Sequence, residues 1–278
     1  MKIRKSILPH GLSDMGSTVF LAICIPAVFI FEIVIILPAF FEPGTLMYIL
    51  HIVLGTFLLF NVTANKITMM LCDTSIKGEK LVPSERTEKL WKMCAVCETL
   101  TPPRTWHCNT CKTCILRRDH HCAFTGCCVG HTNQRYFLML LGYLFVSTFY
   151  ASLYNNYFIW VIHADKFLKN ATILKLAFPL FMIAWDQSIE TCYLAGYLIN
   201  MVGVFFIGFL LIYHMRNVLR GTLTHEKVMA YDLGIKRNIE MVFGVRWYLT
   251  WISPFVTSDL PHDGIHWGDV LEEASKNR

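Results

Sequence analysis

The sequence contains little charge. Asp, Glu, Lys and Arg together make up 16% of its 278 residues, whereas hydrophobic residues make up 54%. A soluble globular domain carries about 25% charged residues, so this composition excludes an ordinary soluble protein. The few charges are crowded into stretches that separate long apolar runs. We therefore expect an integral membrane protein whose charged stretches lie in water.

Other features are also missing. No Gly-rich loop of the GxxxxGK[ST] type is present, which argues against nucleotide hydrolysis. The net charge of +5 comes from basic residues beside apolar runs rather than from an arginine-rich face with interleaved aromatics, so we expect no nucleic-acid partner. We find no internal repeat and no low-complexity tract. The first apolar stretch is longer than the core of a signal peptide and lacks a small-residue cleavage site, so we expect it to remain as a membrane anchor.

Four apolar runs are long enough to cross a bilayer, whose core of about 30 Å needs about 20 helical residues. They are residues 17–40, 46–71, 136–162 and 191–213. The run 173–185 is shorter and is followed by polar and acidic residues. A lumenal or re-entrant segment is the interpretation that we favour for it.

The basic residues predict the orientation of these spans. Of the 25 Lys and Arg, only Lys166, Lys169 and Lys175 lie between the third and fourth long runs. By the positive-inside rule both termini and the central segment are cytosolic, which requires an even number of spans. We predict an all-α polytopic membrane protein with four transmembrane helices, in Golgi or endoplasmic reticulum membranes. The expected divisions are 1–72 (N-terminus and helices 1 and 2), 73–135 (a cytosolic cysteine-rich domain), 136–215 (helices 3 and 4) and 216–278 (a cytosolic C-terminal region).

The central segment predicts metal binding. Eight of the eleven cysteines lie between Cys94 and Cys128, mixed with histidines at metal-ligand spacing, which is typical of zinc in a reducing compartment. The candidate ligands are Cys94, Cys97, His107, Cys108, Cys111, Cys114, His121 and Cys128. Because zinc takes four ligands, eight fill two closed sites. Spacing alone fixes neither which histidine binds nor how the ligands divide between the ions.

Three residues are left over from this count: His120, Cys122 and Cys127, next to Asp119. A surplus cysteine beside a histidine and an aspartate suggests a nucleophile. The alternative is that these residues belong to a zinc module and have no catalytic role.

The segment resembles the cysteine-rich domain of the Asp-His-His-Cys (DHHC) protein S-acyltransferases. The motif reads His107-Cys108-x2-Cys111-x2-Cys114-x4-Asp119-His120-His121-Cys122-x5-Cys128-Val129-Gly130, preceded by Pro102 to Arg104 and followed by Asn133 and Phe137. The family also places this domain between spans two and three of four. After the fourth span, Leu223-Thr224-His225-Glu226 matches the family's Thr-Thr-x-Glu motif except at its first threonine, and Gly234 to Gly244, with Asn238, is similar to its C-terminal motif.

The resemblance implies a division of the ligands. One Cys3His site would hold Cys94, Cys97, His107 and Cys114, and the other Cys108, Cys111, His121 and Cys128. Both zinc ions would be structural, because protein ligands saturate them.

The resemblance also implies the chemistry. Cys122 would attack palmitoyl-CoA, hold the acyl group and pass it to cysteines of client proteins at the cytosolic membrane face, with the acyl chain among the four helices. His120 would act as the base and Asp119 would orient it. Thr224 is expected to support the Asp119 region, and Asn238 to tie the C-terminal segment down. Arg117, Arg118 and Arg135 are candidates for the CoA phosphates or simply orient the membrane segments.

Several positions depart from the family pattern, none of them an expected ligand or a member of the catalytic set. They are Asp73-Thr74-Ser75, Thr101, Ala123-Phe124 and Leu223. These departures keep open the alternative of a membrane zinc-module scaffold with weak or no catalysis.

Overall fold

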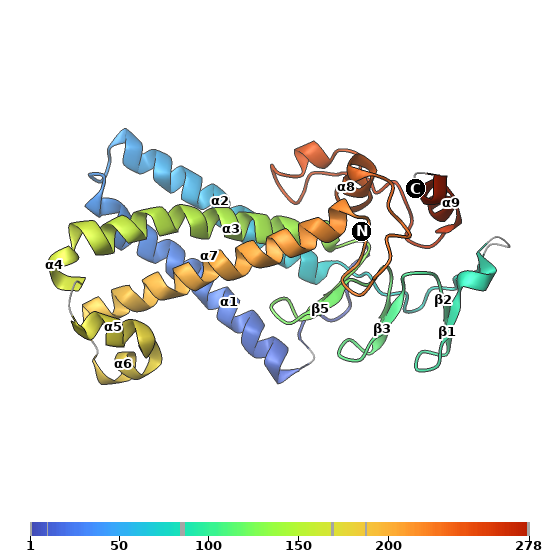
Figure 1. The fold of residues 1–278 in the computed structure, drawn as a ribbon, viewed down its shortest axis with the longest axis horizontal. Helices are drawn as coiled ribbons and strands as arrows, with labels where there is room; N and C mark the ends of the chain where they lie inside the picture. Colours follow the sequence, from blue (N-terminus) through green and yellow to red (C-terminus); the bar gives the residue numbers. More distant parts are fainter. Residues whose placement is uncertain (1, 10, 84–86, 168–169, 187, 277–278) are drawn as a thin grey trace. The chain divides into compact units, whose positions relative to one another are not determined.

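The fold is that of a computed structural model, which describes residues 2–9, 11–83, 87–167, 170–186 and 188–276 (Figure 1). It is predominantly helical. Four helices of this described part are long and apolar enough to cross a membrane: Leu12–Ala39, Leu46–Leu71, Gln134–Ile162 and Ile189–Leu219. The predicted fold class, four spans with the cysteine-rich region between the second and third, is confirmed.

These spans are built from regular helices with local irregularities. The first is α1 (Leu12–Phe31) continued by a π turn, η1 (Glu32–Ile36), and a 3-10 turn, η2 (Leu37–Ala39). The second and fourth are α2 (Leu46–Leu71) and α7 (Ile189–Leu219), and the third is α3 (Gln134–Tyr157) with a π turn, η4 (Phe158–Ile162). The first begins earlier and the fourth ends later than the apolar runs predict, because a helix continues past the point where its side chains stop being apolar.

The short run 173–185 does not form one continuous helix. It forms two short helices, α5 (Asn170–Ala177) and α6 (Pro179–Trp185), and α4 (Ala164–Phe167) precedes them. The break falls at Phe178, because the residue before a proline is disfavoured in helical geometry. Lys169 lies outside the described residues.

The chain divides into two compact units. The second unit contains Ala22–Val62 and Leu141–Leu211. Its buried core gathers residues from η1, η4, α4 and α7: Ile36, Phe158, Ile159, Phe167 and Leu194. Within this unit the side-chain amide of Asn155 donates to the carboxylate of Glu32, which gives a polar partner to an acidic residue inside a span.

The first unit contains Met1–Leu21, Thr63–Leu140 and Ile212–Arg278, and it holds every candidate site residue. After a 3-10 turn, η3 (Glu88–Leu90), six three-residue strands follow. They are β1 (Lys92–Cys94), β2 (Thr99–Thr101), β3 (Trp106–Cys108), β4 (Thr113–Ile115), β5 (His120–Cys122) and β6 (Cys127–Val129). Consecutive strands pair antiparallel, which gives three successive hairpins (Figure 1). In the chain, these hairpins follow α2 and precede α3.

The C-terminal part of this unit is also helical. It contains α8 (Ile235–Phe243), a 3-10 turn, η5 (Trp247–Leu249), and α9 (Gly268–Lys276). Trp267 is fully buried in a core that both α8 and α9 line. The side chain of Asn238 donates to the carbonyl of Leu219 at 3.0 Å and accepts from the amide of Leu233 at 3.1 Å. Asn238 therefore ties α8 to the end of α7.

Candidate metal centres and catalytic cysteine

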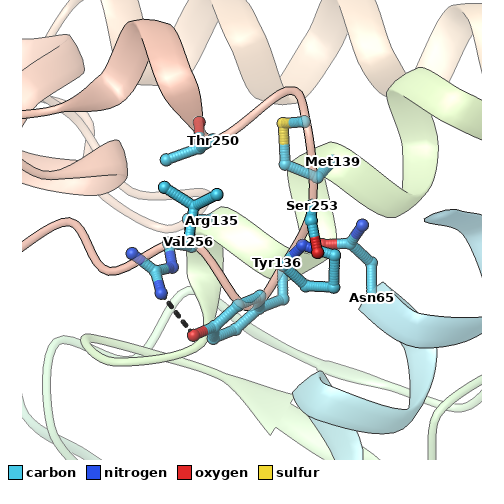
Figure 2. A pocket seen from close by; sticks show the side chains of 8 residues that line it. Asn65, Arg135, Tyr136, Met139, Thr250, Ser253 and Val256 are labelled. Atoms are coloured by element: carbon cyan, nitrogen blue, oxygen red, sulfur yellow. Dashed lines mark hydrogen bonds between the residues drawn. The ribbon is translucent and has the colours of Figure 1, made fainter.

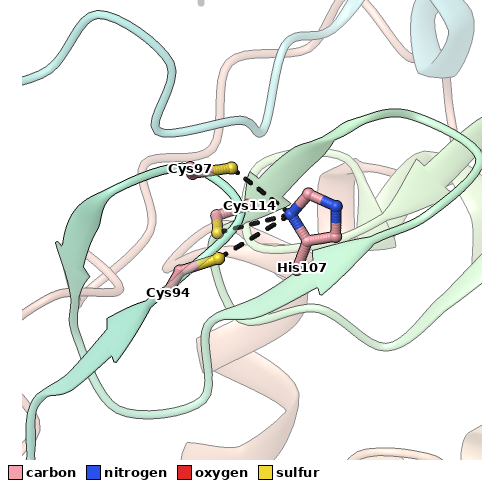
Figure 3. A group of neighbouring side chains, drawn as sticks. All are labelled: Cys94, Cys97, His107 and Cys114. Carbon is pink, nitrogen blue, oxygen red and sulfur yellow. Dashed lines mark hydrogen bonds between the residues drawn. The ribbon is translucent and has the colours of Figure 1, made fainter.

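The first four-residue cluster surrounds the Nδ1 atom of His107 (Figure 3). The Sγ atoms of Cys97, Cys94 and Cys114 lie 3.3, 3.8 and 3.9 Å from that nitrogen. Cys94 and Cys97 come from the first hairpin, whereas His107 and Cys114 face one another across the second. The cluster thus joins two neighbouring hairpins.

The second cluster repeats this arrangement one hairpin further on. The Sγ atoms of Cys111, Cys108 and Cys128 lie 3.3, 3.7 and 3.7 Å from Nδ1 of His121. Here His121 and Cys128 face one another across the third hairpin. The two clusters contain the same sets of residues as the two Cys3His sites that the family resemblance implies.

Both clusters have the dimensions of a tetrahedral zinc site. With zinc bonded to sulfur at about 2.3 Å and to nitrogen at about 2.0–2.1 Å, ideal tetrahedral edges are about 3.6 Å between sulfur and nitrogen and about 3.8 Å between sulfurs. The sulfur to nitrogen distances above bracket the first value, and the Sγ atoms of Cys111 and Cys128 are 3.7 Å apart. The donor sets therefore fit zinc, with four protein ligands and no open position.

The hairpins form these clusters because their turns share one conformation. The residue after Cys97 is Glu98, with φ of 48°, and the residue after Cys111 is Lys112, with φ of 54°. In the third turn the left-handed position is taken by Gly126, with φ of 60°. A left-handed residue at this point closes each tight turn and brings the two ends of the preceding Cys-x2-Cys or Cys-x2-Thr segment together.

Equivalent residues of the three hairpins are fourteen positions apart. Cys94, Cys108 and Cys122 occupy the first position of the three turns, and Cys97, Cys111 and Thr125 the fourth. The expectation that the chain has no internal repeat was therefore wrong.

This repeat explains the surplus cysteine. Each cluster takes two cysteines from one hairpin and a histidine and a cysteine from the next. No hairpin follows the third, because α3 begins at Gln134. Cys122 therefore stands in a ligand position that has no partners from a following hairpin.

Asp119 is a hydrogen-bonding centre beside Cys122. Asp119 is 3% exposed, and its carboxylate lies 2.7 Å from Nδ1 of His120. The backbone amide and the hydroxyl of Thr224 donate to it at 3.0 and 2.8 Å, and Nδ1 of His214 lies 3.5 Å away. The structure thus brings Thr224 to Asp119, where the sequence motif led us to expect it.

The side chains of Asp119, His120 and Cys122 have shifted acidities. Burial of Asp119 favours its neutral form, but the hydrogen bonds and charges of His120 and His214 outweigh burial and hold the pKa of Asp119 well below its ordinary value. Burial of His120 disfavours its charged form, yet Asp119 and Cys122 raise the pKa of His120 to about 9.

The pKa of Cys122 is lowered, whereas that of His120 is raised. Burial raises the pKa of its thiol, but interactions with His120 and with Thr125 outweigh burial, so the pKa lies below its ordinary value. A lowered thiol pKa beside a raised imidazole pKa favours a thiolate paired with an imidazolium.

The segment Leu223–Glu226 is fixed by a buried ion pair. The guanidinium of Arg104 bonds both carboxylate oxygens of Glu226, at 2.8 and 2.6 Å, and lies over the rings of Tyr231 and Trp267. Leu223, which replaces a threonine of the family motif, is buried, and its backbone amide donates to Glu226. The replacement therefore leaves the bonds of Thr224 and Glu226 in place.

The basic residues near the motif are largely occupied within the protein. Arg117 is buried and donates to the side chain of Gln134. Arg135 donates to the carbonyl of Ser258 and to the hydroxyl of Tyr136. Arg117 is thus a structural residue rather than a surface contact for CoA.

A small hollow lies next to Arg135 and Tyr136 (Figure 2). Its other lining residues come from α2, α3 and the segment after η5: Asn65, Met139, Thr250, Ser253, Pro254 and Val256. None of the candidate catalytic or metal-ligating residues lines it.

Two residues near the site were missed by sequence reasoning. Asp14, near the start of α1, lies 2.8 Å from Nε2 of His121, where it fixes the ring of a candidate ligand. His214, near the end of α7, contacts both Asp119 and His120. Neither position belongs to the motif: Asp14 is 107 residues from His121 in the chain, and His214 is 94 residues from His120.

The chain is similar to known proteins over most of its length. Residues 87–230 match the family model described as DHHC palmitoyltransferase. The chain is 34% identical over 246 residues to Probable palmitoyltransferase ZDHHC24 of Mus musculus, covering 82% of each protein. It is 35% identical to the Homo sapiens protein of that name, covering 80% of this chain and 79% of that one. Probable protein S-acyltransferase 12 of Arabidopsis thaliana is 29% identical over 60% of this chain and 54% of its own length. The chain therefore belongs to the DHHC palmitoyltransferase family of multi-pass membrane enzymes.

Proposed function

We propose that the chain transfers a fatty acyl group, typified by palmitate, from acyl-CoA to cysteine thiols of client proteins through an acyl-enzyme on Cys122. The observation that carries this proposal is the pairing of Cys122 with His120, which Asp119 holds, outside two complete metal-ligand sets.

In the first step the Cys122 thiolate attacks the thioester carbonyl of acyl-CoA. A carbon–sulfur bond forms to Cys122, and the bond to the CoA sulfur breaks. The imidazolium of His120 supplies the proton that the departing CoA thiolate takes up. Because one thioester replaces another, the step is nearly isoenergetic and needs no ATP.

In the second step a client cysteine attacks the acyl group on Cys122. His120, now neutral, takes the proton of that thiol as the new thioester forms, and the thiolate of Cys122 is released. The Asp119 carboxylate keeps Nδ1 of His120 occupied, so that Nε2 is the atom that exchanges protons.

The two Cys3His sets would hold zinc with a structural role. Zinc bound there supplies folding free energy and no open coordination position for substrate. His121 would therefore be a ligand, and only His120 would be free to exchange protons. Asp14 would fix the His121 ring from outside the metal site.

We further propose that both termini and the hairpin region face the cytosol of Golgi or endoplasmic reticulum membranes. The distribution of Lys and Arg along the chain supports the orientation. Epitope tags at both termini should bind antibody in cells whose plasma membrane alone is permeabilised. Antibody binding to either tag only after full permeabilisation would refute this orientation.

The test of the proposed function uses purified full-length protein in detergent or nanodiscs with labelled palmitoyl-CoA. We expect hydroxylamine-sensitive label on the protein, followed by its transfer to a cysteine-containing membrane peptide but not to the same peptide with serine. Absence of label from a protein that retains its zinc would favour the alternative of a zinc-module scaffold.

A further inference from the structure

His214 is buried against the catalytic pair although it belongs to another part of the chain. It lies near the end of α7, 6% exposed. Its ring stacks on that of His120, with 4.8 Å between the ring centroids and 29° between the planes. Its Nδ1 atom lies 3.5 Å from the carboxylate of Asp119.

A second ring completes the enclosure of His120. Phe137, in the first turn of α3, meets His120 edge-on with centroids 4.9 Å apart, and meets His214 edge-on at the same distance. The three rings therefore contact one another in pairs. The side chain of His120 remains 24% exposed, so the enclosure leaves part of its ring accessible.

The histidine ring of the catalytic pair needs such an enclosure. His120 is held to Asp119 through one nitrogen, and a single hydrogen bond leaves the ring free to tilt about it. Proton exchange with Cys122 requires the other nitrogen to stay in line with the sulfur, and a misplacement of about 1 Å can cost about a hundredfold in rate. The stacked ring of His214 opposes this tilt.

A metal ion is a weaker interpretation of this cluster. Asp119, His120 and His214 offer ligand atoms within 4.8 Å of one another. However, the carboxylate already accepts two bonds from Thr224 and one from His120. An ion here would have to displace the bond that orients His120.

We propose, on the basis of the proposed acyltransferase function, that His214 is a positioning residue that holds the imidazole of His120 in line with Cys122. It acts in two ways, through its ring stacked on His120 and through its Nδ1–H donated to Asp119. The second role requires a proton on Nδ1, the nitrogen that faces the carboxylate.

Three variants separate the ring from the donor. His214→Phe keeps an aromatic ring and removes the donor, His214→Asn keeps an N–H donor at about the position of Nδ1 and removes the ring, and His214→Ala removes both. The matched control is His225→Ala. His225 is an exposed histidine of the same region, and its ring packs edge-on against Trp106, away from Asp119.

The measurements are the maximal single-turnover rate of acyl-enzyme formation, the KM for palmitoyl-CoA, zinc content and thermal stability. We expect His214→Ala to lower the maximal rate by about 10- to 100-fold with an unchanged KM and two zinc ions. His214→Phe and His214→Asn should each recover part of the loss, and His225→Ala should match wild type. A role in folding alone would lower zinc content or stability and would not produce this order of rates.

Rates within twofold of wild type for both His214→Ala and His214→Phe would overturn the proposal. An equal loss in all three His214 variants with reduced zinc would overturn it as well, because His214 would then support the fold. If His214→Ala does not fold, the rates of the Phe and Asn variants decide between these results. Failure of the wild type to form an acyl-enzyme would refute the proposed function itself, and this inference with it.

Discussion

Replacement of His120 by alanine tests the electrostatics of the catalytic pair. In the structure, burial raises the pKa of the Cys122 thiol and His120 lowers it. His120→Ala removes the lowering interactions of His120 and leaves the burial and the smaller effect of Thr125. We therefore expect the thiol pKa of the variant to rise to its ordinary value or above.

The magnitude follows from the fraction of thiolate. A cysteine with a pKa of about 8.5 is only about 3% ionised at pH 7, so loss of ionisation alone lowers the rate by up to about 30-fold, the limit for a thiol that is fully ionised in the wild type. Removal of the proton donor for the leaving CoA adds to this, and a general acid–base group typically contributes about 10²- to 10⁴-fold. We expect a loss within that range at pH 7.

The pH profile shows whether reduced ionisation of the Cys122 thiol is the cause of the lower rate. In the wild type, Cys122 has a lowered pKa and His120 a pKa raised to about 9, so the ion pair persists between the lowered thiol pKa and about pH 9, and the rate should be flat over that range. In His120→Ala the rate should rise about tenfold per pH unit up to the thiol pKa. The assay is single-turnover autoacylation with labelled palmitoyl-CoA at fixed ionic strength.

His121→Ala is the matched control, since the neighbouring histidine belongs to a Cys3His cluster. It should lose zinc and thermal stability, and higher pH should not restore its rate. The reasoning is refuted if His120→Ala loses zinc while His121→Ala keeps it, or if the rate of His120→Ala is independent of pH.

Three further predictions concern the metal-ligand sets and the hairpin repeat. Cys108→Ser should lower zinc from two ions per chain and reduce thermal stability, because structural zinc contributes folding free energy; normal zinc content and melting would contradict the two-site assignment. Asp14→Asn, which removes the charge facing His121, should weaken zinc affinity by about 10- to 100-fold in chelator competition, whereas unchanged affinity would remove Asp14 from the metal site. Thr125→Cys restores the Cys-x2-Cys pattern in the third turn, so it should bind additional Cd²⁺ and stop acylation at Cys122; elemental analysis showing no additional ion would mean that the third turn cannot act as the other two do.

The sequence was sufficient for features that are local or compositional. Apolar length predicted the four spans, and a ligand count predicted eight metal ligands with Cys122 left over. The division of those ligands into two sets came from the family resemblance. Spacing could not supply it, because each cluster draws on two hairpins whose pairing is a matter of strand register.

Features that depend on long-range contacts could not be read from the sequence. Asp14 and His214 reach the site only because the ends of α1 and α7 pack there, and neither residue stands in a recognisable pattern. The fourteen-residue repeat gives a weak sequence signal, because the residues between its cysteines and histidines share no composition. The left-handed conformation of Glu98 and Lys112, which relates the turns, has no sequence signal of the kind that glycine gives at position 126.

Mapping the acyl group on the protein tests the catalytic assignment most directly. Wild-type protein and Cys122→Ser, each with its zinc content measured, would be incubated with labelled palmitoyl-CoA and analysed by peptide mass spectrometry before and after hydroxylamine. We expect the wild type to carry one hydroxylamine-sensitive acyl group on Cys122, and the variant to carry none while retaining two zinc ions. An acyl group that persists in Cys122→Ser, or a loss of zinc from that variant, would contradict the assignment of Cys122 as a nucleophile outside the metal sites.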